Sequence, residues 1–130
     1  MQISERAVIV KEVPQNCSPR NSRQFLRDLV FELAQVARPA VVLDCLRAER
    51  IDRQTLRLFI WCLEEAMKRN GDVRIAGLHQ DALPVLEAAG VARLLRTYPT
   101  TTDAIESYQR PAFEKLPVDA AEDGPKANAA

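Results

Sequence analysis

Three short apolar segments recur along the chain, each bounded by polar residues or proline: Ala7–Val13, Ala40–Cys45 and Val73–Leu78. Segments of this length, rich in Val, Ile, Leu and Ala, are typical of strands. Ala40–Cys45 is apolar nearly throughout, as expected for a strand that is covered on both faces. Val91–Tyr98 contains a further short apolar segment, which adds a fourth strand candidate.

Between these segments, apolar residues recur at the three-and-four spacing of amphipathic helices. In the first helix this stripe consists of Leu26, Leu29, Val30, Leu33 and Val36. Helices are expected at about 21–36, 53–70, 81–89 and 100–108. Polar residues that can cap a first turn precede three of them: Asn21 or Ser22, Asp81, and Thr100 or Thr101. Gly71 and Gly90 stand at expected helix stops.

The elements alternate as strand and helix, which predicts an α/β domain. We expect a mostly parallel or mixed central sheet of about four strands with about four helices packed on it. Residues 1–109 are expected to form this domain. From Arg110 onward the chain holds three prolines and no long apolar stripe, so we expect residues 110–130 to form a disordered or loosely docked tail.

Composition and charge narrow the class of protein. The 130 residues carry 18 Lys and Arg against 18 Asp and Glu, so the formal net charge is zero, and 47% are hydrophobic. These values are ordinary for one soluble domain, and the lack of a basic surplus argues against a nucleic-acid partner. The longest apolar run, Leu58–Leu63, is too short to span a bilayer, and no signal peptide is evident. We expect a cytoplasmic protein with no membrane insertion.

Residues that carry enzymatic or metal chemistry are sparse. Cys17, Cys45 and Cys62 lack metal-ligand spacing, and an odd number of thiols suits a reducing compartment. His79 is the only histidine, and no nucleophile is placed beside it in the sequence. No glycine-rich phosphate-binding motif is present. We therefore expect no catalytic residue, metal, cofactor or enzyme activity.

The second helix offers a candidate interaction surface. At about 100° per residue, one face is expected to be core: Leu56, Phe59, Ile60, Leu63, Ala66 and Met67. The opposite face gathers Gln54, Arg57, Leu58, Trp61, Glu65 and Lys68. Trp61 is the only tryptophan, and Arg57 could stack on its ring, a composition typical of an interface hot spot. Alternatively, Trp61 is covered by the tail or is simply exposed.

Arginine is dense around the start of this helix. The segment contains Arg47, Arg50, Arg53 and Arg57 against Glu49 and Asp52. Such a cluster fits an acidic partner or a phosphate. A solvated loop rim would have the same composition, so both interpretations stay open.

Several segments, in the right order and spacing, resemble the STAS domain of anti-sigma factor antagonists. Residues 41–52, VVLDCLRAERID, resemble the family's V-V-L-D-L-S-x-V-x-F-I-D strand and loop. Residues 71–78, GDVRIAGL, resemble its fourth strand, and residues 85–95 resemble its V-L-x-x-x-G-L-x-x-L-F segment. The resemblance covers about Ala7 to Tyr108. It implies the STAS fold and a non-enzymatic, protein-binding role.

The resemblance also implies a switch from which this chain departs. In the commonest role, the domain binds an anti-sigma factor that is also a serine kinase, and phosphorylation of the first Ser in D-S-S-G ends binding. Asp52 is retained here, but Arg53 occupies the phosphoacceptor position and has no hydroxyl. Gln54 and Thr55 replace the next Ser and the Gly, and the Thr55 hydroxyl should point about 200° away around the helix. We expect no control by serine phosphorylation.

Together these observations predict a protein-interaction module for bacterial signal transduction and transcription regulation. The expected partner is an anti-sigma factor, serine-kinase-like, or another regulatory protein, and a homodimer stays open. The expected partner-binding residues are Asp52, Arg53, Gln54, Thr55, Arg57, Leu58 and Trp61. The alternative is a structural or regulatory subunit of a larger assembly, either a scaffold or a transporter-associated STAS protein.

Overall fold

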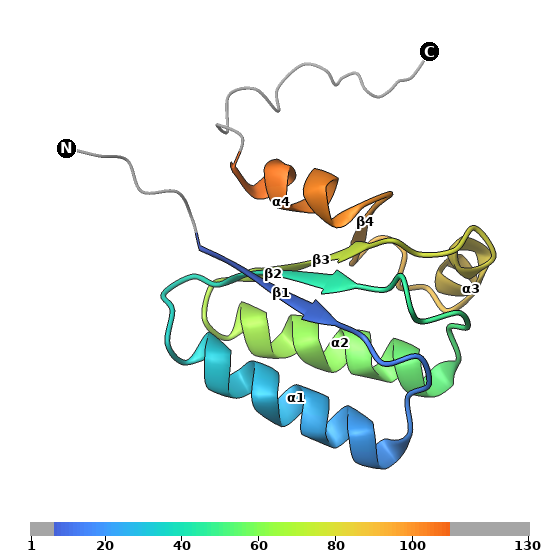
Figure 1. Ribbon diagram of the computed structural model, residues 1–130, viewed down its shortest axis with the longest axis horizontal. Helices are drawn as coiled ribbons and strands as arrows, with labels where there is room; N and C mark the ends of the chain where they lie inside the picture. Colours follow the sequence, from blue (N-terminus) through green and yellow to red (C-terminus); the bar gives the residue numbers. More distant parts are fainter. Residues whose placement is uncertain (1–6, 110–130) are drawn as a thin grey trace.

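Strands and helices alternate along residues 7–109, the part of the chain that the structure, a computed structural model, describes (Figure 1). Their order is β1 (Val8–Glu12), α1 (Pro19–Leu33), β2 (Ala40–Asp44), α2 (Arg53–Met67), β3 (Asp72–Ala76), α3 (Ala82–Ala88), β4 (Arg96–Tyr98) and α4 (Thr101–Gln109). The predicted α/β class is confirmed. Residues 1–6 of the expected domain and the expected tail, 110–130, lie outside the described residues.

The strands form one sheet in the order β1-β2-β3-β4, and each neighbouring pair is parallel. The register aligns Val41 of β2 with Ile9 on one side and with Val73 on the other. The sequence pattern leaves a mostly parallel or mixed sheet as the expectation, and residues 7–109 contain parallel pairings only. Each connection between these strands contains a helix, which returns the chain to the same end of the sheet. All the described strands therefore end at one edge.

Helices cover both faces of the sheet (Figure 1). α1 and α2 lie side by side on one face, α4 lies on the other, and α3 lies near the edge where the strands end. The larger core lies between the sheet and the α1–α2 layer and includes Leu29, Leu43, Phe59 and Ile75. The smaller core lies under α4 and includes Val42, Ala76, Ala104 and Tyr108. Among residues 7–109, no helix is long and apolar enough to cross a membrane.

A buried arginine attaches α4 to the sheet. Arg74 of β3 lies 3.9 Å from the ring centre of Tyr108, donates a hydrogen bond to the Ser107 hydroxyl and pairs with Asp72 at 3.3 Å. The Tyr108 hydroxyl donates to the carbonyl oxygen of Val41 at 2.9 Å. These polar groups therefore have partners within an otherwise apolar interface, which offsets the cost of burying them.

α1 begins earlier than the polar pattern predicts. Ser18, rather than Asn21 or Ser22, is its N-cap. The Ser18 hydroxyl accepts from the Asn21 backbone N–H at 3.0 Å, and the Asn21 side chain accepts from the Ser18 N–H at 2.8 Å. Pro19 takes the first helical position, where its missing N–H is no loss. This capping box uses Asn where Glu or Gln is usual, so the sequence does not match the common motif.

The connection between α2 and β3 depends on backbone conformation. α2 ends at Met67 rather than near Asn70, and Asn70 adopts a left-handed conformation with a φ of 59°. The Gly71 N–H then donates to the carbonyl oxygen of Ala66 at 2.8 Å. A Cβ atom at Gly71 would collide with the carbonyl oxygen of Pro39, so glycine is required at this close approach.

Candidate protein-interaction site

One carboxylate organises the start of α2. Asp52 is the N-cap residue, with an extended backbone. Its Oδ1 atom accepts hydrogen bonds from the backbone N–H and from the hydroxyl of Thr55, both at 2.9 Å. A side-chain acceptor at this position satisfies an N–H group that has no partner within the helix. Asp52 therefore fixes where α2 begins and which way its first residues point.

This arrangement removes Thr55 from the surface. Thr55 is 2% exposed, and its hydroxyl donates to Asp52. Arg53, at the phosphoacceptor position of the motif, is exposed and is the first residue of α2. In residues 52–55 the guanidinium group of Arg53 is therefore exposed to solvent, whereas the Thr55 hydroxyl is buried and hydrogen-bonded.

The exposed face of α2 is rotated relative to the helical-wheel prediction. Leu58, expected on the exposed face, is 0% exposed, and Met67, expected in the core, is 60% exposed. The reason is that α2 packs against α1 as well as against the sheet. Its buried arc therefore includes Thr55, Leu58 and Cys62. The prediction that Leu58 lies on the exposed face is wrong, and neither Leu58 nor Thr55 is placed to contact a partner.

The other predicted site residues reach the surface to different degrees. Asp52, Arg53 and Arg57 are exposed, whereas Gln54 and Trp61 are partly buried. The expected stacking of Arg57 on Trp61 is not among the ring contacts that the structure describes for residues 7–109. The charged residues of the predicted surface are therefore exposed near the start of α2, whereas Trp61 lies further along the helix and is more buried.

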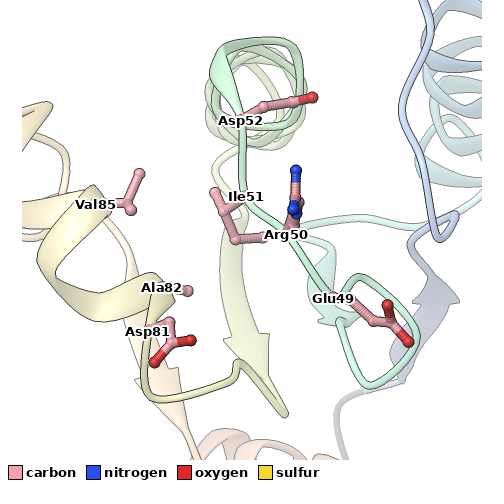
Figure 2. A pocket seen from close by; sticks show the side chains of 7 residues that line it. All are labelled: Glu49, Arg50, Ile51, Asp52, Asp81, Ala82 and Val85. Carbon is pink, nitrogen blue, oxygen red and sulfur yellow. The ribbon is translucent and has the colours of Figure 1, made fainter.

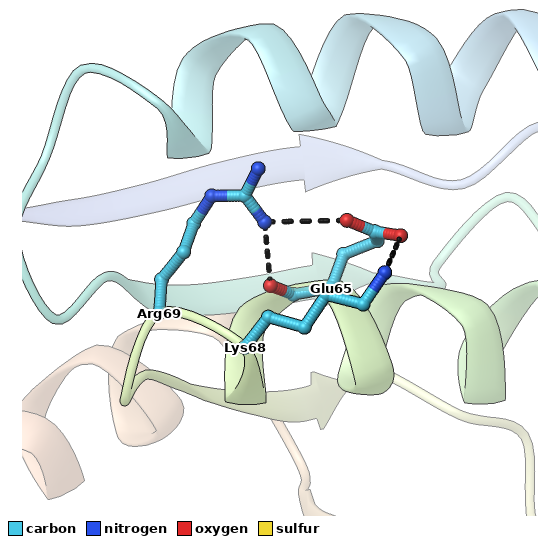
Figure 3. Close-up of polar contacts among 3 residues, drawn as sticks. All are labelled: Glu65, Lys68 and Arg69. Atoms are coloured by element: carbon cyan, nitrogen blue, oxygen red, sulfur yellow. Dashed lines mark hydrogen bonds and ion pairs between the residues drawn. The ribbon is translucent and has the colours of Figure 1, made fainter.

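Trp61 lies on the flank of α2 that faces α1. It precedes Glu65 by one turn, and Figure 3 shows Glu65 and Arg69 on this flank. Glu65 accepts from Lys68 at 3.0 Å and from Arg69 at 3.2 Å. The hydrogen bond from Lys68 is the main reason that the pKa of Glu65 lies below its usual value, and the bond from Arg69 adds to it. This acid is therefore neutralised locally by two cations.

A hollow of about 240 Å³ opens beside the start of α2 (Figure 2). Its lining comes from the loop before α2 and from the start of α3: Glu49, Arg50, Ile51, Asp52, Asp81, Ala82 and Val85. Apart from Asp52 and Arg50, the latter from the arginine cluster considered for an acidic partner or a phosphate, none of these was predicted as a site residue. Topology offers the missing signal, because the loops that follow parallel strands β2 and β3 meet at the carboxyl edge of the sheet.

The arginines around the start of α2 are unpaired within the described part of the chain. Arg50, Arg53 and Arg57 form no ion pair or side-chain hydrogen bond among residues 7–109. Arg47, by contrast, approaches Glu12 at 3.8 Å. Three guanidinium groups therefore remain available to acidic groups of a partner, which they can bind in a bidentate manner.

The thiols and the histidine do not join this surface. Cys45 and Cys62 are buried, and chiefly through that burial the pKa of each thiol rises to about 12. His79 is exposed. Within residues 7–109 no group of three His, Cys, Asp or Glu residues is arranged to hold a metal ion. The site offers guanidinium, carboxylate and aromatic groups, which suit recognition of a protein partner.

Comparison with known proteins identifies the family. No curated protein matches the chain, but the STAS domain family model matches residues 3–104. The NMR structure of the protein TM1081 is similar with a TM-score of 0.70 and 19% identity, covering 80% of this chain and 83% of TM1081. A crystal structure of TM1081, from Thermotoga maritima, gives a TM-score of 0.66 with 79% and 88% covered. An anti-sigma-factor antagonist (STAS) domain protein from Planctomyces limnophilus gives 0.68 at 13% identity, with 78% and 90% covered. Because the family model spans most of its length, the chain belongs to the STAS domain family.

Proposed function

We propose that this STAS domain is a non-enzymatic interaction module of the anti-sigma factor antagonist type. It binds a regulatory protein, an anti-sigma factor or a related kinase-like protein, in the bacterial cytoplasm and so affects transcription. The proposed contact surface consists of Asp52, Arg53, Gln54, Arg57 and Trp61 together with the hollow beside them.

The observation that carries this proposal is the set of unpaired arginines around the start of α2, of which Arg50 also lines the hollow. Arg50, Arg53 and Arg57 are exposed without ion pairs among the described residues, and Val85 presents an apolar side chain across the hollow. Arginine beside apolar surface is enriched at protein interfaces, because its planar group both pairs with carboxylates and packs on apolar atoms.

The same geometry supports binding without a phosphorylation switch at the start of α2. A phosphate there would add about two negative charges inside the interface. Arg53 cannot accept a phosphate, and the hydroxyl of Thr55 is buried and already bonded to Asp52. Control would then depend on the abundance or state of the partner.

A pull-down from native extract with the full chain tests this proposal. Arg53→Glu reverses the charge in the proposed surface, and Arg96→Glu makes the same change at an exposed position of β4. We expect the wild type and Arg96→Glu to retain a common protein partner that Arg53→Glu loses. Equal retention by both variants would overturn the site. Stoichiometric recovery of a membrane transporter or a scaffold would favour the alternative of a subunit in a larger assembly.

A further inference from the structure

α1 carries a second row of arginines near the start of α2. Arg20, Arg23 and Arg27 lie three and four residues apart and therefore share one stripe of the helix. All are exposed, and within residues 7–109 none forms an ion pair or a side-chain hydrogen bond. The same is true of Arg53 and Arg57 on α2. By contrast, Lys68 and Arg69, which directly follow α2, both pair with Glu65.

The orientation of α1 turns this stripe toward α2. Glu32 pairs with Lys11 of the edge strand β1 at 2.6 Å, so the Glu32 side of α1 faces the outer edge of the sheet. Arg23 precedes Glu32 by nine residues, which corresponds to about 180° around the helix. Arg23 therefore lies on the opposite side, which is the side of α2.

The two helices also bring their first turns together. α1 and α2 pack against each other and run parallel, with their N-terminal ends at the same end of the molecule (Figure 1). The arginines of both helices therefore contribute to one surface, which we call the arginine face: Arg20, Arg23, Arg27, Arg53 and Arg57.

Aromatic side chains lie within reach of this face. Phe31, one turn after Arg27, is 71% exposed, and Trp61 is partly buried on the flank of α2 that faces α1. The exposed acids of the two helices are Asp28 and Glu64, and Asp28 accepts a hydrogen bond from Gln24 at 2.9 Å. The surface therefore combines a local excess of guanidinium groups with apolar area.

We propose that the arginine face binds an acidic segment of the partner protein, so that partner contact extends from α2 onto α1. This inference rests on the proposed function, because it enlarges the same surface. Charge complementarity favours a carboxylate-rich polypeptide, since guanidinium groups pair with carboxylates in a bidentate manner. A second copy does not fit, because a two-fold contact would place arginines against arginines. A zero net charge and exposed acids beside the arginines disfavour nucleic acid.

The direct test uses defined probes and the full chain. A fluorescein-labelled peptide of alternating Glu and Ser residues is titrated by fluorescence anisotropy, with a labelled single-stranded DNA of equal charge as comparison. We expect Arg23→Glu/Arg27→Glu to lower affinity for the peptide about tenfold, as expected for reversing two contacting charges. Arg93→Glu/Arg96→Glu makes the same charge change at exposed positions away from α1 and should alter affinity less than about twofold.

Each outcome decides the inference. An equal loss in the two double variants, or tighter binding of DNA than of peptide, would overturn it. Circular dichroism checks the fold, and Arg23→Gln/Arg27→Gln should give an intermediate loss because it removes charge without reversing it. One pull-down result separates the two proposals: Arg53→Glu loses the partner while Arg23→Glu/Arg27→Glu retains it. That result would support the proposed function and overturn its extension onto α1. Retention by both would sink the proposed function itself.

Discussion

The hydroxyl of Thr55 donates to the same carboxylate oxygen of Asp52 that accepts the Thr55 backbone N–H, each at 2.9 Å. Two donors of one residue thus meet one acceptor at the start of α2. The hydroxyl nearest the phosphoacceptor position therefore has a structural role, and the residue that faces solvent there is Arg53. The helix start is held in place while its outer surface is cationic.

Asp52→Ala should destabilise the protein by about 1–2 kcal/mol, because the N-cap bond is lost and the buried Thr55 hydroxyl loses its acceptor. Urea unfolding measures the change. Asp81→Ala is the matched control, since Asp81 precedes α3 without a side-chain capping bond and its removal should cost less than about 0.5 kcal/mol. Equal losses would show that the Asp52–Thr55 pair contributes little.

Neither Arg53 nor Thr55 should carry phosphate after incubation with ATP and native extract. Arg53 has no hydroxyl, and a kinase would have to unwind the first turn of α2 to reach Thr55. Intact-mass and peptide mass spectrometry provide the measurement. Arg53→Ser serves as the control, because it places an exposed hydroxyl at the first helical position and should gain phosphate if a matching kinase is present. Stoichiometric phosphate on Thr55 of the wild type contradicts the prediction.

Leu58→Ala and Met67→Ala test the rotated face of α2. Leu58 is fully buried, so its truncation should cost about 2–5 kcal/mol through lost contacts and a cavity. Met67 is largely exposed, and its truncation should change stability by less than about 0.5 kcal/mol. The helical wheel drawn from the sequence predicts the reverse order, so thermal or urea unfolding of the two variants separates the two assignments.

The order of elements was predictable, whereas their mutual orientation was not. The strands near Val8 and Ala40 and the start of α2 at Arg53 follow from local apolar runs and spacing. A helical wheel, however, assumes that a helix buries only one side. α2 buries two sides, one against the sheet and one against α1. That second contact moves Leu58 inward and Met67 outward.

The hollow and the arginine face depend on neighbours that are distant in sequence. Asp52 and Val85 line one hollow because β2 and β3 end at the same edge. Arg23 and Arg57 contribute to one surface because two parallel helices pack together. Residue spacing within one helix predicts neither relationship. Both can be inferred from the β-α-β order of the elements once a parallel sheet is assumed.

The attachment of α4 gives a graded prediction. Tyr108→Phe removes one hydrogen bond, to the carbonyl oxygen of Val41, and should cost about 1 kcal/mol. Arg74→Ala removes the cation over the Tyr108 ring and the donor to Ser107, and should cost about 2–4 kcal/mol. Urea unfolding measures both changes. A smaller loss for Arg74→Ala than for Tyr108→Phe would show that the arginine does not stabilise the contact between α4 and the sheet.

Alkaline pH should weaken the fold through the buried thiols. Burial raises the pKa of Cys62 from 9.0 to about 12, so the folded protein keeps a proton that the unfolded chain releases above pH 9. Because the folded state binds more protons in this window, stability is fully present below pH 9 and falls as the pH rises toward 12, by at most about 1.4 kcal/mol per pH unit for each thiol. The free energy of unfolding, measured between pH 8 and about 10.5 in urea, should fall less steeply for Cys62→Ala than for the wild type. Lysines and tyrosines ionise in both proteins, so the difference in slope isolates Cys62, and parallel curves would contradict the prediction.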